Sequence, residues 1–192
     1  MGIPGTIDND LSYTDFTLGF DTAVNVVMNT IKMLRDTMSC NDRSCIVLYA
    51  GITSAAEMIL VPEIPFTVQQ VVDRIKNNLD HGKMDNIIVL AEGAGKAEDL
   101  RAEVKKPIPG INIRSMTVGH LQRGGDASFQ DRLLGVRMAA HAVQCLLEGK
   151  TNRVVGVRHN VIIDEDIVEA LSERKSFNKE LYALADQLVE TF

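Results

Sequence analysis

The chain has 192 residues, of which 45% are hydrophobic and 24% are charged, and its formal net charge is −6. This apolar content is too high for a disordered chain, and no apolar stretch approaches the roughly 20 residues that cross a bilayer. The acidic balance argues against nucleic-acid binding, because clustered lysines and arginines are needed to neutralise phosphates. A few focused arginines would still bind a small anion. We therefore expect a soluble globular protein without nucleic-acid or membrane partners.

The three cysteines form a sparse set without metal-ligand spacing: Cys40, Cys45 and Cys145. Reduced thiols in a cytoplasmic protein are the simplest interpretation of such a set. We interpret these cysteines, together with His141 and His159, as packing or surface residues.

Short β-branched runs alternate with amphipathic stretches along most of the chain. The runs predicted as strands are Cys45–Tyr49, Met58–Val61, Asn86–Ala91, Ile111–Val118 and Arg153–Val157. The stretches predicted as helices are Phe20–Thr37, Thr67–Leu79, Lys96–Lys105, Ser128–Glu148 and Lys179–Glu190. Strands separated by helices of this length are typical of βαβ units, so the pattern predicts an α/β fold with a mainly parallel sheet flanked by helices.

Two of the predicted strands are too close together. Only Ala50–Glu57 joins the run at Cys45–Tyr49 to the run at Met58–Val61. A parallel crossover normally takes a dozen or more residues. We therefore expect that this βαβ unit has been shortened.

The N-terminal segment Gly2–Asp10 packs two glycines, a proline and two carboxylates into nine residues. Asp8 and Asp10 stand two residues apart, and an irregular loop can direct both toward one substrate. One carboxylate could then accept a hydroxyl proton while the other orients the substrate or a Mg²⁺ shell. A turn closed by an Asx cap is the alternative that composition alone leaves open.

This segment, Gly-Ile-Pro-Gly-Thr-Ile-Asp-Asn-Asp, resembles the catalytic loop of the 6-phosphofructokinases. Asp15–Ala23 resembles the family's next segment, and Gly119–Gly125 followed by Asp131-Arg132 resembles a later one. The three motifs occur in the family's order, so the resemblance extends over essentially the whole chain.

The resemblance also implies a domain organisation like that of the family's substrate domain. Residues 1–19 would be a catalytic-loop remnant of the larger domain, and residues 20–126 a sugar-phosphate-binding α/β domain. Residues 127–192 would be C-terminal helices and a strand that pack on the larger domain.

By this resemblance, the expected activity is the ATP-dependent phosphorylation of fructose 6-phosphate to fructose 1,6-bisphosphate in glycolysis, with Mg²⁺ accompanying ATP. Asp8 would take the proton from the sugar 1-hydroxyl. Thr6 would hold the sugar or the transferring phosphoryl group, and Asp10 would serve the sugar and the outer metal shell. Gly5 points to ATP as the donor, since family members that use pyrophosphate usually carry lysine there.

Further residues match those with which the family binds fructose 6-phosphate, namely Glu92, Arg114, His120 and Arg123. Arg43 and Arg114 resemble the pair that reaches the 6-phosphate from a neighbouring subunit, which implies a homo-oligomer with a shared active site. The residues alone leave other roles open, because an exposed arginine is usually a solvated charge and Glu92 could be an N-cap.

An effector site is a further expectation. Arg35, Glu57 and Lys83 fall where the bacterial members of the family bind a nucleotide or phosphoenolpyruvate effector.

The sequence departs from the family in two places. The family's N-terminal half, with the Gly-Gly-Asp-Gly-type loops that cradle the ATP phosphates, has no counterpart here, and neither has a Met-Gly-Arg stretch that leads into a helix between Val47 and Glu57. We therefore expect that this chain alone binds a sugar phosphate but transfers no phosphoryl group. A non-catalytic sugar-phosphate or effector-binding module and a structural subunit are the alternatives.

Overall fold

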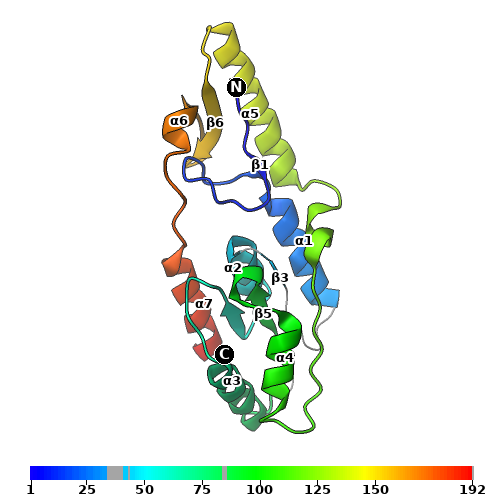
Figure 1. Cartoon of the computed structure of the whole chain (residues 1–192). Coiled ribbons are helices and arrows are strands. Elements are labelled where there is room, and N and C mark those ends of the chain that lie inside the picture. Colours follow the sequence, from blue (N-terminus) through cyan, green and yellow to red (C-terminus); the bar gives the residue numbers. More distant parts are fainter. Residues whose placement is uncertain (34–40, 43, 84–85, 192) are drawn as a thin grey trace. The chain divides into compact units, whose positions relative to one another are not determined.

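A computed structural model of the protein describes residues 1–33, 41–42, 44–83 and 86–191. The chain forms two compact units, each built from segments that are far apart in the sequence (Figure 1). The first unit comprises Met1–Ala23 and Arg123–Phe177, and the second comprises Val24–Gln122 and Asn178–Phe192. The chain passes from one unit to the other after Ala23, Gln122 and Phe177, so the C-terminal helix belongs to the second unit.

The first unit contains two small pairs of strands. Strand β1 (Gly5–Thr6) pairs in parallel with β2 (Leu18–Gly19), and the loop between them carries the predicted catalytic residues Asp8 and Asp10. Strands β6 (Arg153–Arg158) and β7 (Val161–Asp166) form an antiparallel hairpin, which the short helix α6 (Ile167–Ala170) follows. The predicted strand at Arg153–Val157 is thus confirmed as β6.

The sequence analysis did not predict β7. His159 and Asn160 turn the hairpin, and both have positive φ angles, 50° and 63°. Two consecutive left-handed residues are typical of a tight two-residue hairpin turn, but Asn-Gly or Asp-Gly is its usual signal. The acidic residues of β7 further masked its alternating pattern.

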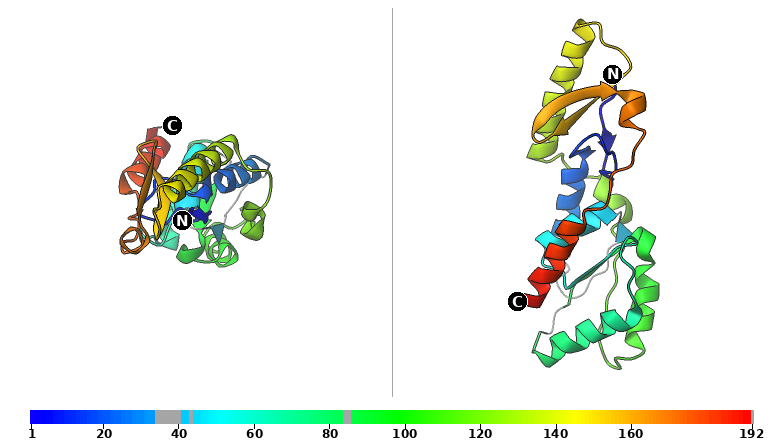
Figure 2. Two further views of the ribbon diagram at one scale, coloured as in Figure 1. Left: turned by 90° about the horizontal axis from the view of Figure 1, so that it is seen from above. Right: turned by 90° about the vertical axis from the view of Figure 1, so that its left-hand side faces the viewer.

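Helix α5 (Phe129–Leu147) packs against this hairpin, as Figure 2 shows. Ser128 is its N-cap, because the Ser128 hydroxyl accepts a hydrogen bond from the Asp131 amide at 3.2 Å. The buried contact is apolar and consists of Met138 and Ala142 on the helix with Val155 and Val157 on β6. Burial of this face holds α5 on the sheet.

A charged cluster joins the same helix to the same hairpin. The carboxylate of Asp164 on β7 lies 3.0 Å from Nε2 of His141 and 3.5 Å from Nζ of Lys150, and it also pairs with Arg153. The hydrogen bond from His141, followed by those from Arg153, lowers the pKa of Asp164 to about 2. Asp164 is therefore ionised at neutral pH.

The second unit contains a three-stranded parallel sheet in the order β3–β5–β4. Its strands are β3 (Asn41–Asp42), β4 (Met58–Leu60) and β5 (Ile88–Ala91). The strands predicted at Met58–Val61 and Asn86–Ala91 are thus confirmed. Parallel strands connected by helices also confirm the α/β class.

The strand predicted at Cys45–Tyr49 is wrong: this run lies inside helix α2 (Ser44–Thr53). Ile46, Val47, Leu48 and Ala50 are all at most 1% exposed, so the helix is apolar around its whole circumference. A run that is apolar on every side suits a buried helix as well as a buried strand, and periodicity alone does not separate them. Because α2 is itself the crossover between β3 and β4, the short joint expected between two strands does not exist.

The strand predicted at Ile111–Val118 is also wrong. The segment contains no described strand, although Ile111 and Ile113 pack against the apolar core of the second unit. Burial of one side of the segment accounts for its alternating pattern of apolar residues. A strand, however, also needs a neighbouring strand for its backbone hydrogen bonds. The preceding Pro107 and Pro109, which lack amide protons, do not favour a ladder here.

The other helix predictions are confirmed apart from their ends. The second unit contains α3 (Val68–Asp80), α4 (Ala97–Lys105), α7 (Lys179–Thr191) and the one-turn helix η1 (Glu92–Ala94). Helix α1 (Phe20–Met33) begins in the first unit, and the rest of its predicted span lies outside the described residues; helix η2 covers Gly119–Arg123. Of the described helices, none has the length and apolarity that a membrane span requires.

The core of the second unit lies between the sheet and helices α3 and α4. Val71, Val72 and Ile75 of α3 meet Leu60 of β4 and Leu90 of β5 there. A capping box starts α3, with Thr67 and Gln70 each accepting a hydrogen bond from the other's backbone amide. Local capping and apolar burial therefore agree in placing this helix.

Helix α7 is hydrogen-bonded to the sheet of the same unit. The Tyr182 hydroxyl donates a hydrogen bond to the carbonyl oxygen of Ile59 on β4 at 3.1 Å. Burial raises the pKa of this phenol, and the charge of Asp186 raises it further.

Candidate active site

The loop between β1 and β2 is held from inside by Asn9. This side chain is only 3% exposed, its Oδ1 accepts a hydrogen bond from the amide of Thr17 at 3.1 Å, and its Nδ2 donates to the carbonyl of Asp15 at 3.2 Å. The Thr17 hydroxyl donates to the carbonyl of Thr6 at 2.5 Å. Asn9 has a φ of 50°, a left-handed conformation that asparagine tolerates better than most residues. The loop is therefore fixed by its own polar groups.

The two predicted carboxylates flank this buried asparagine. Asp8 is half-buried and Asp10 is exposed, so the loop keeps Asn9 inside and presents its neighbours nearer the surface. The amide of Asp8 donates to the Thr6 hydroxyl at 3.2 Å, which brings these two predicted residues together. Because the Thr6 oxygen accepts this bond, its own proton can be donated to a ligand. Thr6 is the last residue of β1, and Asp8 and Asp10 follow it, so all three lie at the carboxyl end of a parallel strand, where binding groups are usually placed.

Lys175 supports the loop from the C-terminal part of the first unit. Its Nζ donates to the carbonyl oxygens of Thr14 and Asp15, both at 2.8 Å, and to Oδ1 of Asn9 at 3.3 Å. The sequence analysis did not identify Lys175, because it lies in an irregular segment with no motif around it.

Asp131 joins the loop to helix α5. This side chain is 7% exposed, and its carboxylate accepts hydrogen bonds from the amides of Gly19 and Thr22, both at 2.8 Å. The hydroxyl of Thr22 donates to the same carboxylate at 2.5 Å and accepts from the amide of Ser128 at 3.0 Å. A carboxylate on the first amides of α1 both caps that helix and suits the positive end of its dipole.

The role of Asp131 was only half-predicted. It was identified only as part of the Asp131-Arg132 motif that resembles the family. A contact to residues more than a hundred positions earlier has no signal in a single sequence.

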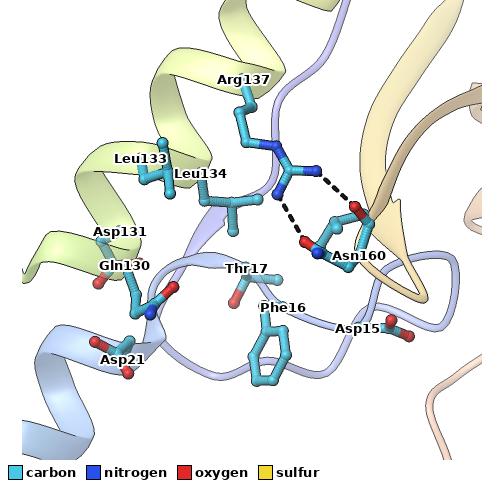
Figure 3. A pocket seen from close by; sticks show the side chains of 11 residues that line it. Asp15, Phe16, Thr17, Asp21, Gln130, Asp131, Leu133, Leu134, Arg137 and Asn160 are labelled. Atoms are coloured by element: carbon cyan, nitrogen blue, oxygen red, sulfur yellow. Dashed lines mark hydrogen bonds between the residues drawn. The ribbon is translucent and has the colours of Figure 1, made fainter.

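A cavity of about 460 Å³ lies beside this loop in the first unit (Figure 3). Asp15, Phe16 and Thr17 line it from the loop, and α5 contributes Arg137, whose guanidinium donates to the side-chain and backbone oxygens of Asn160 at 2.9 and 2.6 Å. Thr6, Asp8 and Asp10 are not among its lining residues, so the cavity is distinct from the predicted catalytic groups.

The predicted sugar-phosphate residues are distributed over both units. Glu92, Arg114 and His120 belong to the second unit and Arg123 to the first, and all four are exposed. In the described part of the chain, no hydrogen bond or ion pair joins Glu92, Arg114 and His120 to one another. Glu92 starts η1 directly after β5, at the carboxyl end of a parallel strand. Arg43, the remaining predicted residue, lies outside the described residues.

Two of the three predicted effector residues meet in the second unit. Nζ of Lys83 lies 3.0 Å from Oε2 of Glu57, whose side chain is 6% exposed. Both residues line a cavity of about 300 Å³, whose other lining residues are mainly apolar and come from α2, the turn that follows it, and α7. Arg35, the third, lies outside the described residues.

The chain is similar to known proteins over nearly its whole length. A family model described as Phosphofructokinase matches residues 1–146. An ATP-dependent 6-phosphofructokinase from Clostridioides difficile (strain 630) is 48% identical over 196 aligned positions, which cover 96% of this chain and 61% of that protein. The structure of phosphofructokinase from Saccharomyces cerevisiae matches with a TM-score of 0.75 and 27% identity, covering 96% of this chain and 26% of that one.

A pyrophosphate-dependent phosphofructokinase from Marinobacter aquaeolei matches with a TM-score of 0.79 over 93% of this chain and 54% of that one. At 23% identity, this match shows the fold alone. The chain spans about 61% of the length of the curated relatives that it matches. Since the family model covers residues 1–146 and the fold agrees with solved members, the chain belongs to the phosphofructokinase family.

Proposed function

We propose that this chain is the substrate-binding portion of an ATP-dependent 6-phosphofructokinase, which converts fructose 6-phosphate and ATP to fructose 1,6-bisphosphate and ADP. The observation that carries the proposal is the internally fixed loop, in which buried Asn9 separates Asp8 from Asp10. Phosphoryl transfer needs an oriented nucleophile and neutralised charge, with little covalent chemistry from the protein. A loop fixed before the substrate arrives provides that orientation.

Each loop residue has a proposed role. Asp8 accepts the proton of the sugar 1-hydroxyl as that oxygen attacks the transferring phosphorus. Thr6, whose oxygen accepts the Asp8 amide at 3.2 Å, donates its proton to the sugar or to the phosphoryl group. Asp10, exposed beside them, contacts the sugar and the water shell of Mg²⁺.

The loop fits Mg²⁺ only as an outer-shell partner. Mg²⁺ binds oxygen ligands, keeps several waters and relies on substrate phosphates. Asp8 and Asp10 supply such oxygens, and in the described part of the chain no group of three acidic residues gathers at this loop. When bound, Mg²⁺ would neutralise charge on the transferring phosphoryl group.

The residues of this chain do not fit the phosphates of ATP. The sequence contains no G-x-x-x-x-G-K-[ST] element. We therefore propose that ATP is bound by the portion of the family fold that this chain does not cover, and that the chain alone transfers no phosphoryl group.

The sugar phosphate would be held by the exposed cationic groups. Arg114, Arg123 and His120 suit a phosphate dianion, for which guanidinium groups provide paired donors, and Glu92 suits sugar hydroxyls. Arg43 with Arg114 would serve the 6-phosphate of a neighbouring subunit in a homo-oligomer.

A second candidate is an effector-binding role, which the ion pair of Glu57 and Lys83 in a cavity favours. The lysine is 45% exposed at its side chain, so it can turn toward an anionic nucleotide or phosphoenolpyruvate. In that case, replacement of Lys83 would weaken effector binding without changing the affinity for fructose 6-phosphate.

Phosphoryl transfer tests the proposal directly. A chimera would join the N-terminal portion of the Clostridioides difficile relative to this chain, and ADP formation would be measured with fructose 6-phosphate, ATP and Mg²⁺. We expect activity in the chimera, none in the chain alone, and a loss of about 10³-fold in Asp8→Asn, within the range for a general base. Asp99→Asn, an exposed position on α4, is the matched control. Transfer by the chain alone that persists in Asp8→Asn would contradict the proposal.

A further inference from the structure

Helix α5 and strand β7 bring three metal-ligating side chains together in the first unit, away from the β1–β2 loop. His141, Cys145 and Asp164 each offer one ligand atom, and these atoms all lie within 4.8 Å of one another. His141 and Cys145 are one helical turn apart, the i, i+4 spacing at which two side chains share a helix face. Asp164 faces them from β7, where it is the register partner of Val155. We propose that these three residues form a zinc-binding site.

The spacing suits a small cation in place of the present hydrogen bond. Nε2 of His141 lies 3.0 Å from Oδ1 of Asp164, and Sγ of Cys145 lies within 4.8 Å of the ligand atoms of both residues. In a tetrahedral zinc site the ligand atoms lie about 3.3–3.6 Å apart, as follows from zinc–ligand bonds of about 2.0–2.3 Å. Small side-chain adjustments therefore convert the cluster into a metal site without moving the backbone.

The donor set selects the metal. One sulfur, one imidazole nitrogen and one carboxylate oxygen are ligands that Zn²⁺ accepts together. Mg²⁺ and Ca²⁺ require oxygen ligands, so a site with a cysteine and a histidine does not suit them. Because Cys145 is 1% exposed and His141 is partly exposed, the solvent side of the cluster would supply a water as the fourth ligand.

The neighbouring cations do not block the site. Lys150 lies 3.5 Å from Oδ1 of Asp164, but it also lies 3.1 Å from Oε2 of Glu148 and keeps that partner when a metal takes Oδ1. Arg153 pairs with the other carboxylate oxygen, Oδ2, and donates to the Asp164 carbonyl at 2.7 Å. It therefore orients the carboxylate as an outer partner of the metal ligand.

Zinc at this position would stabilise the first unit. The ligands come from α5 and β7, which are otherwise held together by apolar contacts and the Asp164 ion pairs. A metal that binds the folded state preferentially stabilises it by mass action. We expect the thermal midpoint of the metal-stripped protein to rise when Zn²⁺ is added.

Cobalt substitution tests the site. Because the chain has three cysteines, a Cys40→Ser/Cys45→Ser background leaves Cys145 as its single thiol. We expect Co²⁺ added to the metal-stripped protein in this background to give a thiolate-to-cobalt absorption band that saturates at one ion per chain. Added Zn²⁺ should abolish the band by displacement.

Two further substitutions in that background identify the other ligands. His141→Asn should weaken Co²⁺ binding at least tenfold, as should Asp164→Asn, whereas His159→Asn in the hairpin turn should leave it unchanged. If a ligand variant does not fold, X-ray absorption of the zinc-loaded single-thiol protein identifies the zinc ligands without that variant. We expect one sulfur ligand together with nitrogen or oxygen ligands. The absence of a cobalt band in the folded single-thiol protein, or a zinc shell without sulfur, would overturn the proposal.

Discussion

The hydroxyl of Thr22 lies 2.5 Å from the carboxylate of Asp131, and this contact joins the first turn of α1 to the first turn of α5. The same carboxylate accepts hydrogen bonds from the amides of Gly19 and Thr22. It therefore caps the start of α1, which follows the loop that carries Asp8 and the short strand β2. The candidate active site therefore depends on a residue that does not belong to the loop. Substitutions in and around the candidate active site test this dependence.

Replacement of Asp131 by asparagine should destabilise the first unit. Asparagine keeps the volume but loses one acceptor and the charge, and hydrogen bonds to charged groups contribute about 1.5–3 kcal/mol each. We expect a loss of about 2–3 kcal/mol in the free energy of unfolding, measured by urea denaturation followed by circular dichroism. Asp126→Asn, at an exposed position in the preceding loop, should change the value by less than about 0.5 kcal/mol. Equal effects at the two positions would contradict this role for Asp131.

Two substitutions at Asn9 test its backbone conformation and its side-chain hydrogen bonds separately. Asn9→Gly keeps the left-handed φ of 50° accessible but removes the bonds to Thr17 and Asp15, whereas Asn9→Ala removes both. We expect both variants to weaken fructose 6-phosphate binding, and Asn9→Ala to be the less stable by about 1 kcal/mol because of the positive φ. If either variant binds the sugar phosphate as the native chain does, the loop is not positioned by Asn9.

Gly51 tests the assignment of residues 44–53 to a helix. A Cβ atom at Gly51 would lie 2.6 Å from the side chain of Ile59, so Gly51→Ala should destabilise the protein by about 1–3 kcal/mol although alanine favours helices. Gly135 in α5 is the matched control, because a Cβ there would meet its nearest neighbour, Leu18, at an ordinary 3.8 Å. Gly135→Ala should stabilise the protein by up to about 1 kcal/mol. Stabilisation by both substitutions would show that Gly51 does not pack against β4.

Tyr182 links the docking of α7 to pH. Because its folded-state pKa is raised, the neutral phenol stabilises the fold below the unfolded pKa of about 10, and this contribution is lost as the pH rises further. Tyr182→Phe should cost about 0.5–1.5 kcal/mol at neutral pH through the lost bond to Ile59, and its stability should fall less between pH 9 and about 11. Parallel pH profiles for the two proteins would contradict this assignment.

The sequence predicted the elements whose signals are local. Two helices were predicted to start at Thr67 and Ser128, and the structure has the capping residues of α3 and α5 at these positions. The α/β class followed from the same alternation of runs. These features depend on residues within one or two turns of each other, which a single sequence displays.

What the sequence did not predict depends on tertiary contacts. Cys45–Tyr49 and Ile111–Val118 were assigned to strands because apolar runs do not reveal whether a neighbouring strand is available. In the candidate site, the loop residues were predicted, but the supports from Lys175 and Asp131 arise from segments more than a hundred residues away. His141 and Cys145 were interpreted as packing residues for the same reason, since Asp164 approaches them only in the fold.

The most direct test of the central claim is calorimetric titration of the purified chain with fructose 6-phosphate, with fructose as the control. We expect saturable binding of fructose 6-phosphate, no binding of fructose, and a loss of affinity of at least tenfold in Arg114→Ala and Arg123→Ala. Arg74→Ala, on α3 outside the site, should bind as the native chain does. Absence of binding, or equal heats for the two sugars, would contradict the account of this chain as a sugar-phosphate-binding portion.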